Sequence, residues 1–245
     1  MDCQPPSMKM VYNWLNNNHN CLLCELPAQG PTPICEACQA DLPWLDERCT
    51  VCALPLAMAG FTCGQCLRHR PAFRRVQAPW HYGYPLDSLI SQFKHAGRWP
   101  VGRLLAELLG QWLAHHFADG MPRPDCLLPV PMGRKRLRQR GFNQATMLAQ
   151  WLARQLALPL HEDWLLRPHD TQAQQDLGAR ARKLNLRQAF ALAPQAAVSG
   201  QHIALVDDVM TTGATAQALA LLLRQAGARR VDVYCLARTG KPGQP

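Results

Sequence analysis

Two adjacent carboxylates followed by a turn rich in hydroxyl groups are the part of this sequence best suited to chemistry. Asp207 and Asp208 follow an apolar stretch. Two residues separate them from the segment Thr211-Thr212-Gly213-Ala214-Thr215. Neighbouring acids are costly to bury unless vicinal hydroxyls or a hard cation pair with them. A glycine and threonines at a helix start offer backbone N–H groups and hydroxyls to a phosphate. In that order, the groups suit a phosphorylated ribose.

A plainer interpretation is that the acids only cap the following helix. Capping needs a single acid, however, and it does not need a run of small and hydroxylated residues. The sequence contains no G-x-x-x-x-G-K-[ST] motif, which excludes an ordinary P-loop. We therefore expect a phosphate site of another kind.

The elements around the acids must bring them to one edge of a sheet. Residues 203–206 are wholly apolar, as in a parallel strand with both faces buried. Residues 216–223 have helical apolar spacing that closes at Gly227, and residues 231–236 form a second apolar run. Such a βαβ unit binds ligands at the carboxyl ends of its strands, where we expect Asp207 and Asp208 in a loop.

The preceding residues continue this alternation of helices and strands. Residues 87–97 and 101–117 have helical periodicity, residues 126–130 and 164–166 predict short strands, and residues 141–143 predict a turn and N-cap before another helix. The pattern predicts an α/β domain with an open, mainly parallel sheet over residues 80–240.

The N-terminal part carries a repeated cysteine pattern instead. Four C-x-x-C pairs begin 14 residues apart, and the first and third pairs share a following Leu-Pro, which makes the repeating unit 28 residues long. We predict two structural Zn²⁺ sites in a module over residues 18–70, each with four thiolates. The ligands are Cys21, Cys24, Cys35 and Cys38 at one site, and Cys49, Cys52, Cys63 and Cys66 at the other. Interleaved pairing of alternate pairs is the second possibility.

Other uses of these cysteines fit less well. Disulfides need an oxidising compartment, and no signal peptide or apolar run long enough to cross a membrane is present, so we expect a cytoplasmic protein without membrane insertion. A redox motif would be a single C-x-x-C pair beside a βαβ unit. Structural zinc is closed and catalyses nothing, so the module is expected to serve docking or nucleic-acid contact.

The positive charge is concentrated. The chain has a net charge of +9, and 13 of its 26 Lys and Arg residues lie in segments 68–75, 134–140 and 180–187. Concentrated basicity usually faces an anionic partner, although solvated faces are the alternative. Residues 67–79 are expected to form a hinge. Several rings lie in or beside the basic segment 68–75, namely Phe73, Trp80, His81, Tyr82 and Tyr84. They could stack on single-stranded nucleic acid, or they could simply pack between the two modules.

At this point the residues carry a family resemblance. Residues 203–215, IALVDDVMTTGAT, resemble the thirteen-residue signature of type I phosphoribosyltransferases, which bind phosphoribosyl pyrophosphate (PRPP). Lys94-His95-Ala96-Gly97-Arg98, Val130-Pro131, residues 134–144 and residues 174–190 extend the likeness. With the cysteine-rich module, the chain resembles the competence protein F (ComF) family, including its GntX branch.

This resemblance implies roles for particular residues. Asp207 and Asp208 would be the catalytic acids that hold the ribose hydroxyls with Mg²⁺ nearby, and the loop after Pro131 would bind pyrophosphate through Arg134 and Arg140. Arg182 or Lys183 could reach the ligand from a mobile loop. The full set of expected PRPP-binding residues is Val206, Asp207, Asp208, Val209, Met210, Thr211, Thr212, Gly213, Ala214, Thr215, Arg134 and Arg140.

The resemblance also implies a function in DNA uptake or in the use of DNA as a nutrient. The expected partners are PRPP, single-stranded DNA and DNA-uptake or helicase-type proteins. As an enzyme, the protein would let an acceptor displace pyrophosphate from the anomeric carbon, but no segment indicates which acceptor. The alternatives are a non-catalytic PRPP sensor and a single-stranded-DNA-binding module that retains the PRPP site.

Overall fold

The computed structural model describes residues 19–168 and 189–240 and divides the chain into two compact units. The small unit is residues 1–42 and the large unit is residues 43–245. The division falls inside the cysteine-rich segment, so the two cysteine clusters belong to different units. In the described part of the chain, no helix has both the length and the apolar character needed to cross a membrane.

The small unit is built around its cysteines. Strands β1 (His19–Asn20) and β2 (Pro27–Ala28) pair antiparallel, and helix α2 spans Glu36–Ala40. Among the described residues of this unit, the buried apolar ones other than cysteine are few: Ala28, Ile34 and Leu42. A core this small needs a metal or another cross-link to fold.

The large unit contains a parallel sheet, which confirms the predicted α/β class. Its order is β3 (Arg75–Gln77), β9 (Arg230–Arg238), β8 (His202–Met210), β5 (Cys126–Pro129), and β4 (Trp80–His81) also pairs with β9. Every one of these pairings is parallel. The central strands are buried almost throughout, as their apolar composition predicts.

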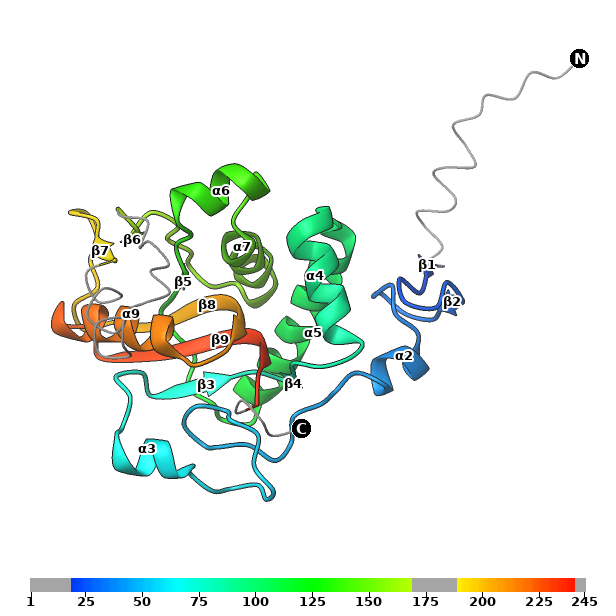
Figure 1. Cartoon of the computed structure of the whole chain (residues 1–245), viewed down its shortest axis with the longest axis horizontal. Helices are drawn as coiled ribbons and strands as arrows, with labels where there is room; N and C mark the ends of the chain where they lie inside the picture. The colour runs from blue at the N-terminus through cyan, green and yellow to red at the C-terminus, as the bar shows by residue number, and fades with distance from the viewer. Residues whose placement is uncertain (1–18, 169–188, 241–245) are drawn as a thin grey trace, which may run out of the picture. The chain divides into compact units, whose positions relative to one another are not determined.

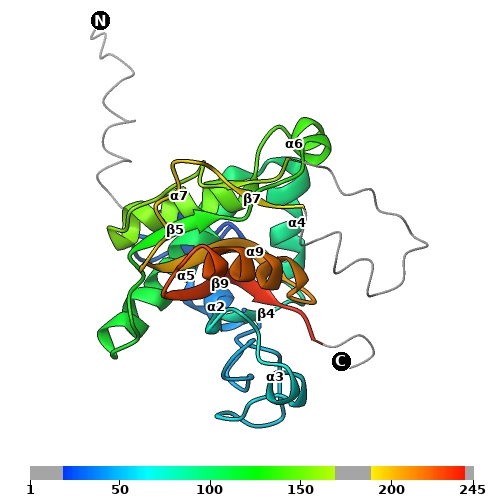
Figure 2. The same ribbon diagram turned by 90° about the vertical axis from the view of Figure 1, so that its left-hand side faces the viewer.

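Helices cover the sheet (Figures 1 and 2). Helices α4 (Leu86–Ala96), α5 (Trp99–Ala118) and α7 (Gln144–Leu156) pack together, and α5 and α7 contact the sheet. Helix α9 (Ala214–Gln225) connects β8 to β9 and packs on β9, which completes the predicted βαβ unit. Asn143 caps α7 by accepting a hydrogen bond from the Ala145 amide at 3.1 Å, as expected of its position.

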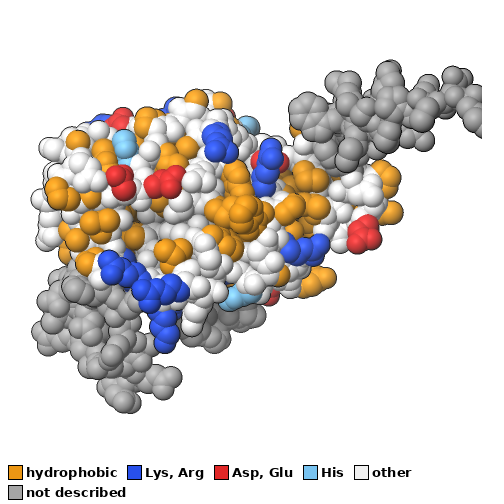
Figure 3. Space-filling view, turned by 90° about the horizontal axis from the view of Figure 1, so that it is seen from above, with side chains coloured by type: hydrophobic (Ala, Val, Ile, Leu, Met, Phe, Trp, Pro, Cys, Tyr) orange, Lys and Arg blue, Asp and Glu red, His pale blue; other side chains and the backbone are white. Residues whose placement is uncertain are grey.

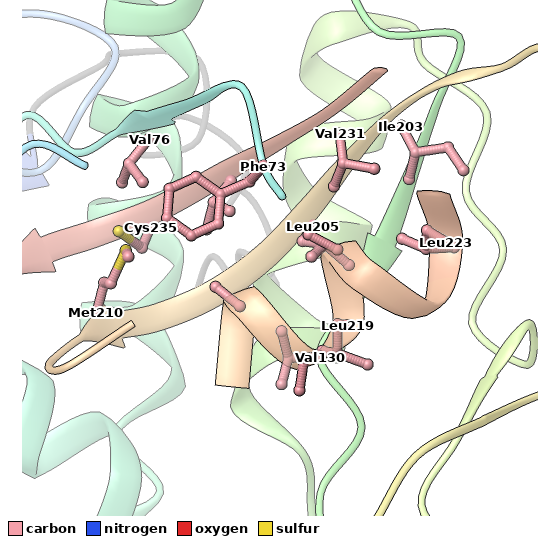
Figure 4. Packing of buried hydrophobic residues seen from close by; sticks show 14 of the residues in the cluster. Phe73, Val76, Val130, Ile203, Leu205, Met210, Leu219, Leu223, Val231 and Cys235 are labelled. Carbon is pink, nitrogen blue, oxygen red and sulfur yellow. The ribbon is translucent and has the colours of Figure 1, made fainter. Parts of the chain in front are cut away.

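One core cluster joins α9, the sheet and the second cysteine cluster. Leu205, Val231 and Cys235 point from the strands toward the same cluster as Leu219 of α9 and Phe73 (Figure 4). The cluster also includes a set from the cysteine-rich segment: Cys49, Cys52, Ala53, Leu54, Cys63 and Cys66. The second cysteine cluster is therefore built into the core of the large unit.

The expected hinge at residues 67–79 is wrong. Helix α3 covers Gly64–Arg68, and residues 75–77 form β3, hydrogen-bonded to β9. Phe73 and Trp80 are 4% and 0% exposed, so they serve packing, as the plainer interpretation of these aromatics holds. The sequence does not indicate this strand, because the strand is short and follows a segment rich in arginine.

Three short elements complete the described part of the large unit. Helix α6 spans Arg134–Arg140, and strands β6 (Leu165–Leu166) and β7 (Ala191–Leu192) pair antiparallel. Residues 169–188, which include Arg182 and Lys183, fall outside the described residues.

Candidate functional site

The acidic pair lies at the carboxyl end of β8, within the strand. We expected a loop there, but β8 continues through Asp207 and Asp208 to Met210, and Asp207 is in register with Cys235 of β9. The apolar end of β9 supplies the pairing that extends the strand. Both acids are half-buried, and their backbone is fixed by the sheet. Sheet pairing therefore holds the two carboxylates in a defined position at the edge where ligands of such sheets bind.

A lysine distant in sequence pairs with one of these two acids. Lys94 Nζ of α4 lies 2.9 Å from Asp208 Oδ2, and the two side chains are 18% and 15% exposed. The pKa of Asp207 is raised to about 7, mainly by burial and secondly by the neighbouring charge of Asp208. The backbone N–H of Asp208 and the charge of Lys94 act in the opposite direction, but they are weaker. Residues 94–98 form a motif in the sequence, but nothing local to it indicates that Lys94 meets the acids.

The hydroxyl-rich turn follows directly. Thr211 and Thr212 are exposed, and Thr212 Oγ1 accepts a hydrogen bond from the Ala214 amide at 3.3 Å. Gly213 has φ of 75° and precedes α9, a helix of 12 residues, whose N-terminus therefore points toward this turn. Free backbone N–H groups, a helix dipole and threonine hydroxyls together can hold a phosphate.

Gly213 is required by both its conformation and its surroundings. Replacing Gly213 by Ala should destabilise the protein by about 1–2 kcal/mol for the left-handed residue and by a smaller further amount for moving Met210, because the added Cβ would lie 2.5 Å from Met210 Cε, the far end of a flexible side chain. Thermal unfolding measures the difference. Gly200→Ala is the matched control, since Gly200 has φ of 74° and open space around it. Equal destabilisation by the two substitutions would contradict the contact with Met210.

The basic segment expected to be the pyrophosphate loop is largely helical. Residues 134–140 form α6, in which Arg134 is exposed and Arg140 is half-buried. Helix α6 follows β5, and β5 pairs in parallel with β8, with Pro129 opposite Val206. The segments that follow these two strands therefore leave the sheet at the same edge. Asn143 Nδ2 donates to the Val130 carbonyl at 3.0 Å and closes the segment. In the described part of the chain, neither Arg134 nor Arg140 pairs with an acid.

The cysteines form two clusters of four. In each cluster the sulfur atoms lie within 4.8 Å of one another, and the members are the two sets that the 28-residue repeat predicts. Interleaved pairing is not what the described residues show. The first set is Cys21, Cys24, Cys35 and Cys38, and the second is Cys49, Cys52, Cys63 and Cys66.

Both clusters use the same backbone turn. The Cys21 amide donates to Leu26 and the Glu25 amide to Cys21, just as the Cys49 amide donates to Leu54 and the Ala53 amide to Cys49. Glu25 and Ala53 both have positive φ, of 64° and 52°. The sequence repeat is therefore a repeat of geometry.

The electrostatics of the second cluster favour a cation once its thiols ionise. Burial raises the pKa of the Cys52 thiol to about 11 and also raises that of Cys66. At Cys49, burial also acts to raise the pKa, but the backbone N–H groups of Cys52, Cys63 and Val51 outweigh it, and the pKa falls to about 7. Four thiols at this spacing cannot all ionise without a compensating charge, which tetrahedral Zn²⁺ supplies.

Comparison with known proteins bears on both parts of the chain. A family model described as a double zinc ribbon domain matches residues 13–67. The two clusters fit the two zinc sites of such a domain.

Relatives of the chain match it over most of its length. DNA utilization protein YhgH of Escherichia coli (strain K12) is 37% identical over 221 residues, covering 89% of this chain and 96% of that protein. Competence protein F of Haemophilus influenzae is 35% identical over 209 residues, covering 84% and 90%. Competence protein ComFC of Bacillus subtilis is 24% identical over 214 residues, covering 84% of each. The alignment of 221 residues necessarily includes parts of both compact units.

Solved structures also align with part of the chain. The glutamine PRPP amidotransferase from B. subtilis, complexed with ADP and GMP, covers 55% of this chain and 25% of its own, with 19% identity and a TM-score of 0.38. Purine phosphoribosyltransferase from Pyrococcus horikoshii covers 55% and 70%, with 17% identity and a TM-score of 0.34.

Proposed function

The chain belongs to the family of DNA utilization protein YhgH and competence protein F, and from that premise we propose that the carboxyl edge of its sheet binds PRPP. The observation that carries the proposal is the acidic pair of β8 followed at once by a hydroxyl-rich turn at a helix N-terminus. Carboxylates accept hydrogen bonds from vicinal hydroxyls, and the turn donates to a phosphate. The two parts suit opposite ends of one ribose phosphate.

Each group has a distinct task in this proposal. Asp207 and Asp208 accept from the ribose hydroxyls, and residues 211–215 hold the 5-phosphate through backbone N–H groups and hydroxyls. Arg134 and Arg140 of α6 lie on the chain that leaves the neighbouring strand, where they can pair with pyrophosphate. Val206, Val209 and Met210 contribute backbone within the same segment.

Magnesium fits the same edge of the sheet. Carboxylate oxygens and substrate phosphates are the ligands that Mg²⁺ prefers, and Asp207 with Asp208 offers the carboxylates. Lys94 already supplies one compensating charge to Asp208, so the pair as a whole has room for a further cation. Mg²⁺ would neutralise the pyrophosphate as it leaves.

Turnover and binding separate a transferase from a sensor. In a transferase, an acceptor displaces pyrophosphate from the anomeric carbon through a cationic transition state, and the protein positions both groups. We expect zinc-loaded protein to bind PRPP in a calorimetric titration and to bind it more tightly with Mg²⁺. Released pyrophosphate in the presence of a base would establish catalysis, whereas binding without release would establish a sensor. Absence of PRPP binding in both conditions would end the proposal.

A second function is favoured by the basic face around α6. All five cationic residues of segment 134–140 lie on this helix, and Trp99, whose ring centroid lies 6.2 Å from that of Phe142 just after α6, is 54% exposed. Figure 3, seen from the side on which α6 lies in Figure 1, shows Lys and Arg side chains beside exposed hydrophobic side chains. Cations with exposed aromatic rings suit single-stranded nucleic acid, and the relatives are named for DNA utilization and competence.

This function predicts a particular dependence on salt. Affinity for single-stranded DNA should fall steeply with salt, and Arg138→Gln should reduce the slope of log K against log salt by about 0.7 if one phosphate contact is lost. Arg229→Gln is the matched control, because Arg229 is an exposed arginine that precedes β9, at the opposite edge of the sheet. Fluorescence anisotropy at several salt concentrations measures both slopes. Binding that is absent at low salt, or equal slopes in both variants, would contradict this interface.

A further inference from the structure

A single buried guanidinium connects the second cysteine cluster to the turn that follows the acidic pair. Arg238, the last residue of β9, is 6% exposed. Its Nε donates to the Cys52 carbonyl at 3.0 Å, and its Nη1 donates to the Met210 carbonyl at 3.0 Å and to the Thr211 carbonyl. One planar group therefore fixes the backbone of both segments at once.

The position of the Cys52 carbonyl is set by the metal-binding turn. Cys52 belongs to the second set of four thiols, and its peptide lies inside the turn closed by the Ala53 amide to the Cys49 carbonyl at 3.0 Å. Ala53 has positive φ, which a residue with a side chain adopts only when its surroundings enforce it. Zinc holds the four thiolates together and so maintains this turn.

Two further contacts reinforce the connection. The Ala72 amide, six residues after Cys66, donates to Gln217 Oε1 in the first turn of α9 at 2.8 Å. The Val76 amide of β3 donates to the Val51 carbonyl at 2.8 Å, within the same cysteine turn. The second cluster is thus hydrogen-bonded to the sheet, and the chain that follows it is hydrogen-bonded to the first turn of α9.

The surroundings of Arg238 make these bonds energetically important. Within the described residues, no carboxylate lies within 4.0 Å of its guanidinium. A buried cation without an acid depends on the carbonyls that replace its water, and each lost carbonyl leaves a charged donor unsatisfied. If Cys52 moves, the guanidinium of Arg238 must shift to keep its donors satisfied, and its hydrogen bonds to the Met210 and Thr211 carbonyls change as well.

We propose that the second zinc ribbon is a positioning device for the phosphate-binding turn, and that Arg238 is the positioning residue that couples the two. Zinc at the second site holds the Cys52 carbonyl, Arg238 holds Met210 and Thr211, and the turn is thereby ordered for the 5-phosphate. Zinc occupancy at this site then sets the affinity for the sugar phosphate. The inference rests on the proposed PRPP site and names what regulates it.

Linkage gives a test on the unaltered protein. If zinc at the second site favours PRPP binding, PRPP must favour zinc retention there by the same factor. A chelator is added to the zinc-loaded full chain with and without PRPP and Mg²⁺, and released cysteines are alkylated and identified by peptide mass spectrometry. We expect PRPP to slow labelling of Cys49, Cys52, Cys63 and Cys66 about tenfold, a coupling of usual size, and to leave labelling of the first set unchanged. Equal slowing at both sets, or none while PRPP is bound, would overturn the proposal.

A variant tests the coupling residue itself. Arg238→Lys should weaken PRPP binding about tenfold, as expected when hydrogen bonds of a charged group are lost, and should speed amide exchange at residues 211–213. Arg229→Lys, a change of the same kind at an exposed arginine, should do neither. Unchanged affinity and exchange in a folded Arg238→Lys protein would refute the role of Arg238.

The two proposals fail differently. If the wild-type chain binds no PRPP, the proposed function is wrong, and amide exchange at residues 211–213 still reports the coupling when chelation empties the second site. Faster exchange there, with exchange in α7 unchanged, would support the positioning device. Unchanged exchange, or equally faster exchange in α7, would reject it. If the wild-type chain binds PRPP but neither zinc removal nor Arg238→Lys affects binding, only the further inference fails.

Discussion

Replacing Asp208 by Asn is expected to weaken PRPP binding by about 1.5–3 kcal/mol, the usual value of a hydrogen bond to a charged group. The amide keeps the size of the side chain but removes the charge that accepts from a ribose hydroxyl. It also leaves Lys94 without its acid, since Asp208 Oδ2 lies 2.9 Å from Lys94 Nζ. Isothermal titration calorimetry with PRPP measures the change.

A double-mutant cycle separates the two consequences. Lys94→Met alone removes the cation, and Lys94→Met with Asp208→Asn removes the pair. If Asp208 contacts the ribose, the double variant stays weaker than Lys94→Met alone. If Asp208 only pairs with Lys94, the two variants bind PRPP equally. Unchanged affinity in Asp208→Asn would remove this residue from the site altogether.

Removing zinc is expected to have the largest effect on folding. Structural zinc contributes on the order of 10 kcal/mol of apparent binding energy per site, and residues 19–42 include only a few buried apolar side chains besides the cysteines. Chelation should release two ions per chain and unfold the cysteine-rich segments. Native mass spectrometry counts the ions, and circular dichroism follows the loss of structure.

Cysteines outside the clusters provide the control for this experiment. Cys126 lies in β5 and belongs to neither set of four thiols, so it is not expected to be a ligand. Cys126→Ala should keep both ions, whereas Cys24→Ser should keep one. A wild-type protein carrying one ion or none would contradict the two-site arrangement.

The sequence was informative where chemistry is local. The 28-residue repeat predicted which thiols gather, because a C-x-x-C turn places two ligands whatever surrounds it. The apolar runs at residues 203–206 and 231–236 predicted the central strands, because a strand buried on both faces must be apolar throughout. The glycine and threonines after β8 predicted the turn before α9 for similar local reasons.

Contacts between residues that are distant in sequence could not be predicted. Strand β8 continues through the polar Asp207 and Asp208 because β9 lies beside them, and a single sequence does not show that pairing. Lys94 meets Asp208 only because the packing of α4 against α5 brings it to that edge of the sheet. Arg238 is a polar residue at the end of an apolar strand, and nothing in the sequence connects it to Cys52.

A crystal structure of the zinc-loaded protein with PRPP and Mg²⁺ would test the central claim most directly. The account predicts density for the 5-phosphate within hydrogen-bonding distance of the backbone at residues 211–215, and for the ribose hydroxyls against Asp207 and Asp208. PRPP bound at another surface, with the β8 carboxylates facing only Lys94 and water, would contradict it.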